Sequence, residues 1–84
     1  MTDVRAWLVE RTYSDRDLLT LVYATSDGER YLQKELAGRL GGETTAAIDV
    51  EEGRLAQVDD DAVKERYAAE VERMTAQHEP DDMV

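Results

Sequence analysis

The stretch Thr20–Lys34 (TLVYATSDGERYLQK) decides the fold, because it has the pattern of a single β-hairpin. A run of β-branched and aromatic residues precedes the turn pair Asp27 and Gly28, and a second such run follows from Arg30. An Asp-Gly pair between two such runs predicts a tight two-residue turn, since both central residues of that turn adopt φ > 0. Closure at this pair sets three cross-strand partners: Ala24 with Tyr31, Tyr23 with Leu32, and Leu21 with Lys34.

This register divides the hairpin into two faces, because successive side chains of a strand point to opposite sides. We expect the first face to form the core against a helix; it carries Leu19, Leu21, Tyr23 and Leu32. We expect the second face, with Val22, Ala24 and Tyr31, to point toward a partner.

Three further segments have strand character. Val4–Tyr13 is rich in β-branched and aromatic residues, but neither of its faces is purely polar, which indicates cover on both faces or a β-bulge. Thr44–Val50 and Arg54–Val58 predict a second hairpin around the turn at residues 51–53, with a short helical turn at 54–58 as the alternative. Residues 36–42 fit either the end of the third strand or a short helix.

The C-terminal part predicts one long helix. Asp59, Asp60 and Asp61 supply an N-cap and the negative charge that suits a helix N-terminus, and Pro80 ends the helix. Apolar and semi-polar residues then recur with a helical period: Val63, Tyr67, Val71, Met74 and His78.

The predicted fold class is therefore α+β, with an antiparallel sheet packed by one C-terminal helix. The sheet consists of a three-stranded meander extended by the second hairpin. We expect a single domain over residues 1–78 and a mobile acidic tail over residues 79–84.

The composition is strongly acidic. Among 84 residues, 20 are Asp or Glu and 10 are Lys or Arg, which gives a net charge of −10. The bases are eight Arg and two Lys, and Phe and Cys are absent. This pattern indicates adaptation to molar salt, in which surface carboxylates hold hydrated cations without a specific site. Residues 41–84 carry most of the excess, with thirteen acids and four bases.

Three segments carry a resemblance: WLVERTY at residues 7–13, YATSDGERY at 23–31 and ERYAAEVERM at 65–74. Through them the chain resembles small uncharacterised acidic proteins of halophilic archaea, a family of unknown function. The resemblance implies a source and no particular activity.

The sequence contains no pattern typical of an enzyme or a cofactor site. The acidic runs lack the alternating acids and central Gly of a Ca²⁺ loop, and a single His without Cys is a poor transition-metal set. No phosphate-binding Gly-rich loop and no nucleophile elbow occur. We therefore expect a non-enzymatic protein with no cofactor and no metal site.

The remaining candidate is an interaction surface on the sheet. Alternation places Trp7, Val22 and Tyr31 on a face that one helix would leave uncovered, with Arg5, Arg11 and Arg30 at its rim. This pattern predicts a cytoplasmic protein-interaction module, with a homodimer as one form. The alternative is single-stranded nucleic-acid binding through stacked aromatics and arginines. No apolar run approaches the roughly 18 residues that span a membrane.

Overall fold

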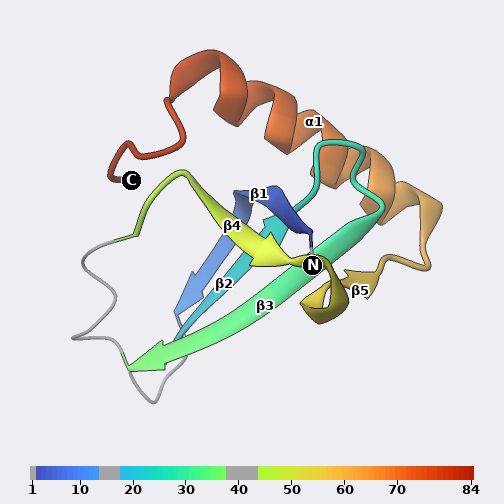
Figure 1. Cartoon of the computed structure of the whole chain (residues 1–84), viewed down its shortest axis with the longest axis horizontal. Coiled ribbons are helices and arrows are strands. Elements are labelled where there is room, and N and C mark those ends of the chain that lie inside the picture. The colour runs from blue at the N-terminus through green and yellow to red at the C-terminus, as the bar shows by residue number, and fades with distance from the viewer. Residues whose placement is uncertain (1, 14–17, 38–43) are drawn as a thin grey trace.

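The computed structural model describes residues 2–13, 18–37 and 44–84. Its elements follow one another along the chain as β1 (Asp3–Tyr13), β2 (Leu18–Ala24), β3 (Arg30–Ala37), β4 (Ala47–Glu51), the 3₁₀ helix η2 (Glu52–Arg54), β5 (Ala56–Gln57) and α1 (Asp61–Gln77). Figure 1 shows one helix packed on a twisted sheet. The α+β prediction is confirmed.

The five strands form one antiparallel sheet in the order β4-β1-β2-β3-β5. The second hairpin is therefore wrong as a pairing, because β4 pairs with β1 whereas β5 pairs with β3. A 3₁₀ turn occupies residues 52–54, ahead of most of the segment 54–58 for which strand and helical turn were the alternatives, and within that segment Ala56 and Gln57 form a strand. Of the ambiguous residues 36–42, the first two end β3 and the rest lie outside the described residues.

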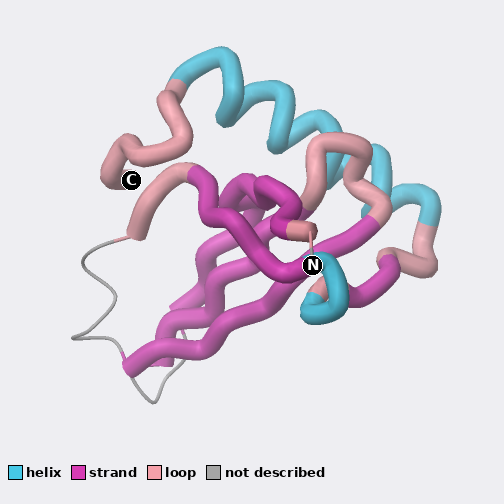
Figure 2. The backbone as a smooth tube through the Cα atoms, viewed as in Figure 1, coloured by secondary structure: helices cyan, strands magenta, loops and turns pink. Residues whose placement is uncertain are grey.

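The short link between β4 and β5 makes the sheet curl. These strands are at opposite edges, which in a flat five-stranded sheet lie roughly 19 Å apart. The chain from Glu51 to Ala56 reaches about 17 Å when fully extended and less when it contains a 3₁₀ turn. The two edges must therefore approach each other, and Figure 2 shows the strands wrapped into a strongly twisted sheet.

The hairpin register is confirmed for all three predicted pairs. The turn itself differs from the two-residue prediction: Thr25 N–H donates to the Arg30 carbonyl oxygen at 3.0 Å, so the loop contains the four residues 26–29. Gly28 adopts φ = 73° and its N–H donates to the Thr25 carbonyl oxygen at 2.8 Å. A four-residue loop preserves the same cross-strand register as a two-residue one, which is why the pairing was predictable without the turn type.

A bulge in β1 explains its mixed pattern. Leu8 lies opposite Tyr23 and Glu10 lies opposite Val22, so Val9 is the extra residue. Because of the extra residue, the alternation counted from Val4 no longer holds after Val9. Glu10 therefore lies on the face of Val22, and Arg11 lies on the face of Leu21. The strand therefore has both features that its sequence pattern left as alternatives: a bulge, and buried residues on each face, Trp7 on one and Leu8 on the other.

The helix covers the face that we expected to remain free. Val63 and Tyr67 of α1 line one groove together with Val22 and Tyr31, which share a face of the β2–β3 ladder. The opposite face is also core, since Leu19 and Leu21 are each only 1% exposed. The prediction that the helix packs on Leu19, Leu21, Tyr23 and Leu32 is thus wrong. Apolar side chains are buried on both faces of the curled sheet, so burial of this face did not require the helix.

The helix itself follows the sequence pattern. Asp60 is the N-cap, and its carboxylate accepts hydrogen bonds from the N–H groups of Ala62 at 2.8 Å and Val63 at 3.4 Å. The buried residues of α1 all belong to the predicted stripe: Tyr67, Val71 and Met74.

The segment 79–84, which the sequence predicts to be mobile, lies against residues 44–47. Three backbone hydrogen bonds of 2.8–3.0 Å join them: Ala46 N–H to Asp82 O, Ala47 N–H to Pro80 O, and Val84 N–H to Thr44 O. The segment thereby extends the edge of the sheet next to β4.

Candidate functional site

The apolar residues of the predicted interaction surface share the face of the sheet on which the helix lies. Trp7 is 8% exposed, Val22 is 4% exposed, and Tyr31 is half-buried. Trp7 and Val22 belong to the same buried cluster as the inner face of α1. A partner cannot reach these two side chains in the folded chain, so the predicted surface needs correction: its centre is part of the core.

The three arginines of the predicted rim lie apart from one another. Arg5 Nε is 3.4 Å from Asp49 Oδ1, directly across from it on β4. Arg30 Nη1 is 3.2 Å from Glu52 Oε1. Arg11 lies near Tyr23, whose pKa is raised by burial and held back in part by the Arg11 charge.

The structure does not gather the bases and aromatics of the nucleic-acid hypothesis on one exposed face. Two of its arginines are in ion pairs, and its Trp is buried.

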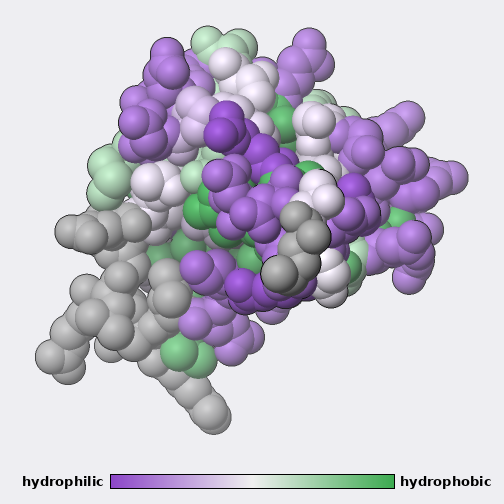
Figure 3. Space-filling view, viewed as in Figure 1, coloured by the Kyte–Doolittle hydropathy of each residue, from purple (hydrophilic) through white to green (hydrophobic). Residues whose placement is uncertain are grey.

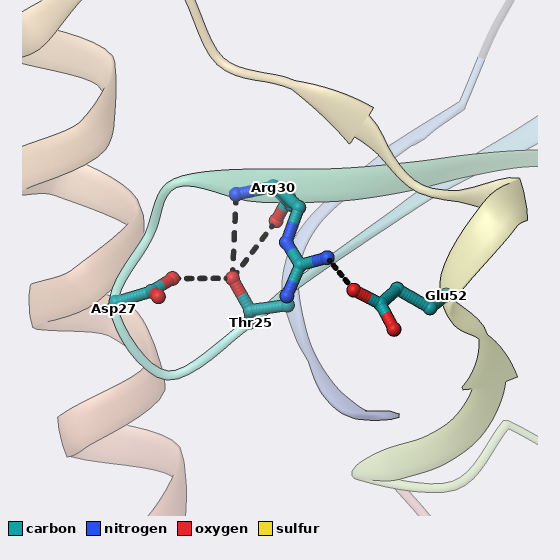
Figure 4. A network of polar contacts seen from close by, with 4 residues as sticks. All are labelled: Thr25, Asp27, Arg30 and Glu52. Carbon is teal, nitrogen blue, oxygen red and sulfur yellow. Dashed lines mark hydrogen bonds and ion pairs between the residues drawn. The ribbon is translucent and has the colours of Figure 1, made fainter. Parts of the chain in front are cut away.

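A polar network organises the tip of the β2–β3 hairpin (Figure 4). Thr25 Oγ1 donates to Asp27 Oδ1 at 2.6 Å, and the Arg30 N–H donates to Thr25 Oγ1 at 3.3 Å. The Glu29 N–H donates to the same Asp27 oxygen at 3.0 Å. Arg30 then reaches out of the loop to Glu52 of η2, so the network connects the hairpin tip with the link between β4 and β5.

These hydrogen bonds set the electrostatics of the tip. The Thr25 hydroxyl and the Glu29 N–H lower the pKa of Asp27 by stabilising its carboxylate. Asp27 is therefore ionised near neutral pH and acts as an acceptor for its own loop, which is a structural role.

An open pocket of about 490 Å³ adjoins this network, between the hairpin tip, β5 and the start of α1. Its charged lining consists of four acids and two bases: Asp27, Glu29, Glu52, Asp59, Arg30 and Lys64. Within the described residues, no three His, Cys, Asp or Glu side chains are placed to hold a metal ion. The pocket is therefore an open, mostly charged depression between these elements.

Beyond Tyr31, no strand of the described residues pairs with the outer edge of β3. The Thr25–Arg30 hydrogen bond fixes the alternation, so that the even-numbered residues of β3 bond to β2 and the odd-numbered ones point their N–H and C=O outward. The hydrogen bond from Val58 N–H to the Glu29 carbonyl oxygen, 2.8 Å, agrees with this alternation. β5 pairs with β3 at Arg30 and Tyr31 only.

Gln33 and Glu35 therefore present outward backbone groups with no strand beside them in the described part of the chain. Both side chains are exposed. We call these two residues the β3 edge.

A groove of about 330 Å³ lies between β3 and α1, and Gln33 is one of its lining residues. Its apolar lining comes from the sheet, the residue that follows β5 and the helix: Val22, Tyr31, Val58, Val63 and Tyr67. Its acidic lining consists of Glu10, Asp59 and Asp60. We call this site the Tyr67 groove.

The β3 edge was not found by sequence reasoning. Strand pairing is non-local, and the sequence around residues 30–37 does not show that β5 stops after two residues. Lys34 and Glu35 were the one available signal, because charged residues are typical of exposed edge strands.

Hydrophilic side chains dominate the visible surface in Figure 3. No helix among the described residues is long and apolar enough to cross a membrane.

Comparison with known proteins identifies the family and nothing further. The model of a family of unknown function, DUF7967, matches residues 1–84, so the chain belongs to this family. No curated protein and no solved structure matches the chain.

Proposed function

We propose that this member of the DUF7967 family is a non-enzymatic protein-interaction module that binds an extended segment of a partner at the β3 edge. The observation that carries the proposal is the early end of β5, after which no described segment pairs with the outward N–H and C=O groups of Gln33 and Glu35. Such groups are a template for an added strand, and main-chain hydrogen bonds supply affinity in this mode of recognition.

The covered sheet face favours the edge over a face-to-face contact. α1 lies on the face of Trp7 and Val22, and these residues are buried within the chain. A second molecule would have to displace the helix to use that face, whereas strand addition at β3 requires no rearrangement of the core.

The charge supports a high-salt setting for this module, the cytoplasm of a halophile. The chain has twenty acids against ten bases, and only two of the bases are Lys. The absence of Cys suits a reducing compartment.

The test is a selection of random ten-residue peptides on the immobilised wild-type chain, followed by binding measurements with the Gln33→Pro variant. Proline removes the outward N–H of Gln33 and leaves the bonds between β3 and β2 intact, since Gln33 does not bond to β2. We expect the selected peptides to lose about tenfold or more in affinity, because one ladder hydrogen bond is lost and the proline ring blocks the edge.

The matched control is Tyr13→Pro, which makes the same change at the other end of the sheet. Tyr13 is the last residue of β1, is 67% exposed and lies opposite Leu19 of β2. Its N–H points away from β2. The selected peptides should bind this variant as they bind the wild type. Peptides that bind Gln33→Pro equally well, or the failure of any peptide to be enriched, would refute strand addition at β3.

A further inference from the structure

We infer that the partner strand carries a basic residue opposite Glu35 and, two residues later, an apolar residue opposite Gln33. This inference rests on the proposed function and names the chemistry of the segment that the β3 edge accepts. It follows from the register that an added strand must adopt and from what lies beside each position.

The register comes from the ladder of the sheet. All pairs in this sheet are antiparallel, and an antiparallel strand that bonds to the outward groups of Gln33 and Glu35 places one residue directly opposite each of them. Directly opposite residues share a face, so both partner side chains lie on the face of Gln33, which is also the face of Val22.

The position opposite Gln33 lies next to the Tyr67 groove. Gln33 is part of the groove lining together with Tyr31, Val63 and Tyr67. An apolar side chain at this position gains contact with those side chains and removes part of their area from water, which favours binding.

The position opposite Glu35 requires a positive charge. Glu35 is an exposed carboxylate at this position of the β3 edge. With a net charge of −10, the chain as a whole also attracts basic segments. Opposite charges directly across a ladder stabilise the pair, whereas like charges destabilise it.

A second copy of this chain fits the β3 edge poorly. The antiparallel register in which both copies use both Gln33 and Glu35 is centred on Lys34, so that Lys34 would lie directly opposite its own equivalent. Centring the pair on Glu35 instead places two carboxylates opposite each other. Centring it on Gln33 places Glu35 opposite Tyr31, where β5 is already bound.

The experiment uses three labelled ten-residue peptides that share a Thr-rich strand background. The first has Arg-Thr-Leu at its centre, the second has Leu-Thr-Arg with the same composition, and the third has Glu-Thr-Leu. Fluorescence anisotropy measures their affinity for the full chain at moderate salt. We expect the first peptide to bind about tenfold more tightly than either of the others, which corresponds to ~1.4 kcal/mol.

A charge exchange provides the decisive variant. Glu35→Lys changes an exposed side chain and leaves the outward backbone groups in place. In this variant the Glu-Thr-Leu peptide should bind more tightly than the Arg-Thr-Leu peptide, which reverses the wild-type order. An unchanged order would overturn the assignment of the basic residue.

The outcomes separate this inference from the proposed function. If selected peptides depend on Gln33 but lack the basic and apolar pair in this order, the edge is a binding site and the partner chemistry is wrong. If sedimentation shows a wild-type dimer that Gln33→Pro dissociates, the occupant is a second copy and this inference is overturned. If no peptide depends on Gln33, strand addition itself fails.

Discussion

Gly28 at the tip of the β2–β3 hairpin lies directly against the backbone carbonyl of Lys64 in α1. A Cβ atom added to Gly28 would overlap the Lys64 carbonyl oxygen and lie 2.9 Å from the Ala68 nitrogen. These are backbone atoms of a helix that is held in place by its own hydrogen bonds, so they cannot move aside cheaply. The absence of a side chain at Gly28 is what allows the hairpin tip to pack on the helix.

Gly28→Ala should therefore destabilise the chain strongly. The variant combines an unfavourable positive φ with an overlap against helix backbone, for which we expect a loss of about 2–4 kcal/mol in the free energy of unfolding. Urea unfolding followed by circular dichroism measures the change. Gly53→Ala is the matched control, because nothing lies within 4 Å of its added Cβ; it should change stability by less than about 1 kcal/mol. Equal effects of the two variants would argue against the contact between hairpin and helix.

Trp7→Ala should unfold or strongly destabilise the chain. Trp7 is 8% exposed and belongs to the buried cluster, so its truncation should cost about 3–5 kcal/mol. Tyr13→Ala on the same strand should cost far less, since Tyr13 is 67% exposed. Thermal unfolding of both variants compares the two positions. A Trp7→Ala variant as stable as Tyr13→Ala would mean that Trp7 is on the surface, as the sequence pattern alone predicts.

Asp27 should make the free energy of unfolding depend on pH. Its hydrogen bonds from Thr25 and Glu29 lower its pKa in the folded state below that of the unfolded chain. The ionised carboxylate therefore stabilises the fold fully above the unfolded pKa, near 4, and this contribution is lost as the pH falls through the lower folded pKa. The difference in stability between wild type and Asp27→Asn should be largest near neutral pH and shrink below about pH 4.

Nuclear magnetic resonance can follow the same carboxyl group directly. Thr25→Val removes the largest cause of the lowered pKa, so the titration midpoint of Asp27 should rise in that variant. A midpoint that does not move would show that the Thr25 hydroxyl does not stabilise the carboxylate.

Added salt should stabilise the chain. With a net charge of −10, carboxylate repulsion is strong at low ionic strength and is screened over about 3 Å at 1 M salt. We expect the melting temperature to rise between about 0.1 M and 2 M KCl. Replacing the exposed Glu65 and Glu72 of α1 by Gln should reduce this rise. A melting temperature that stays constant with KCl would contradict a high-salt setting.

The sequence predicted the pairing of the residues in the proposed interaction surface but not their burial. The six residues of the predicted surface came from strand alternation, and the cross-strand pairs of Val22 and Tyr31 within the hairpin are as expected. Alternation identifies two faces but does not say which one a helix covers, because both faces of β2 are apolar. Leu19 and Leu21 on one face, and Val22 and Ala24 on the other, are all buried.

The sequence by itself determined the local features of this protein. The register of the β2–β3 hairpin, an N-cap within Asp59–Asp61 and the stripe of Tyr67, Val71 and Met74 depend on residues close together in the chain, so their patterns predict them. Only the tertiary structure decided that β4 returns to β1, that β5 joins β3 for two residues, and that α1 covers the face of the sheet that carries Val22 and Tyr31. These pairings and this packing depend on the whole chain, because the curled sheet and the helix together must bury both apolar faces of the strands. Burial is a property of the whole fold and cannot be read from one segment. Among the described residues, this fold leaves the edge of β3 at Gln33 without a neighbouring strand.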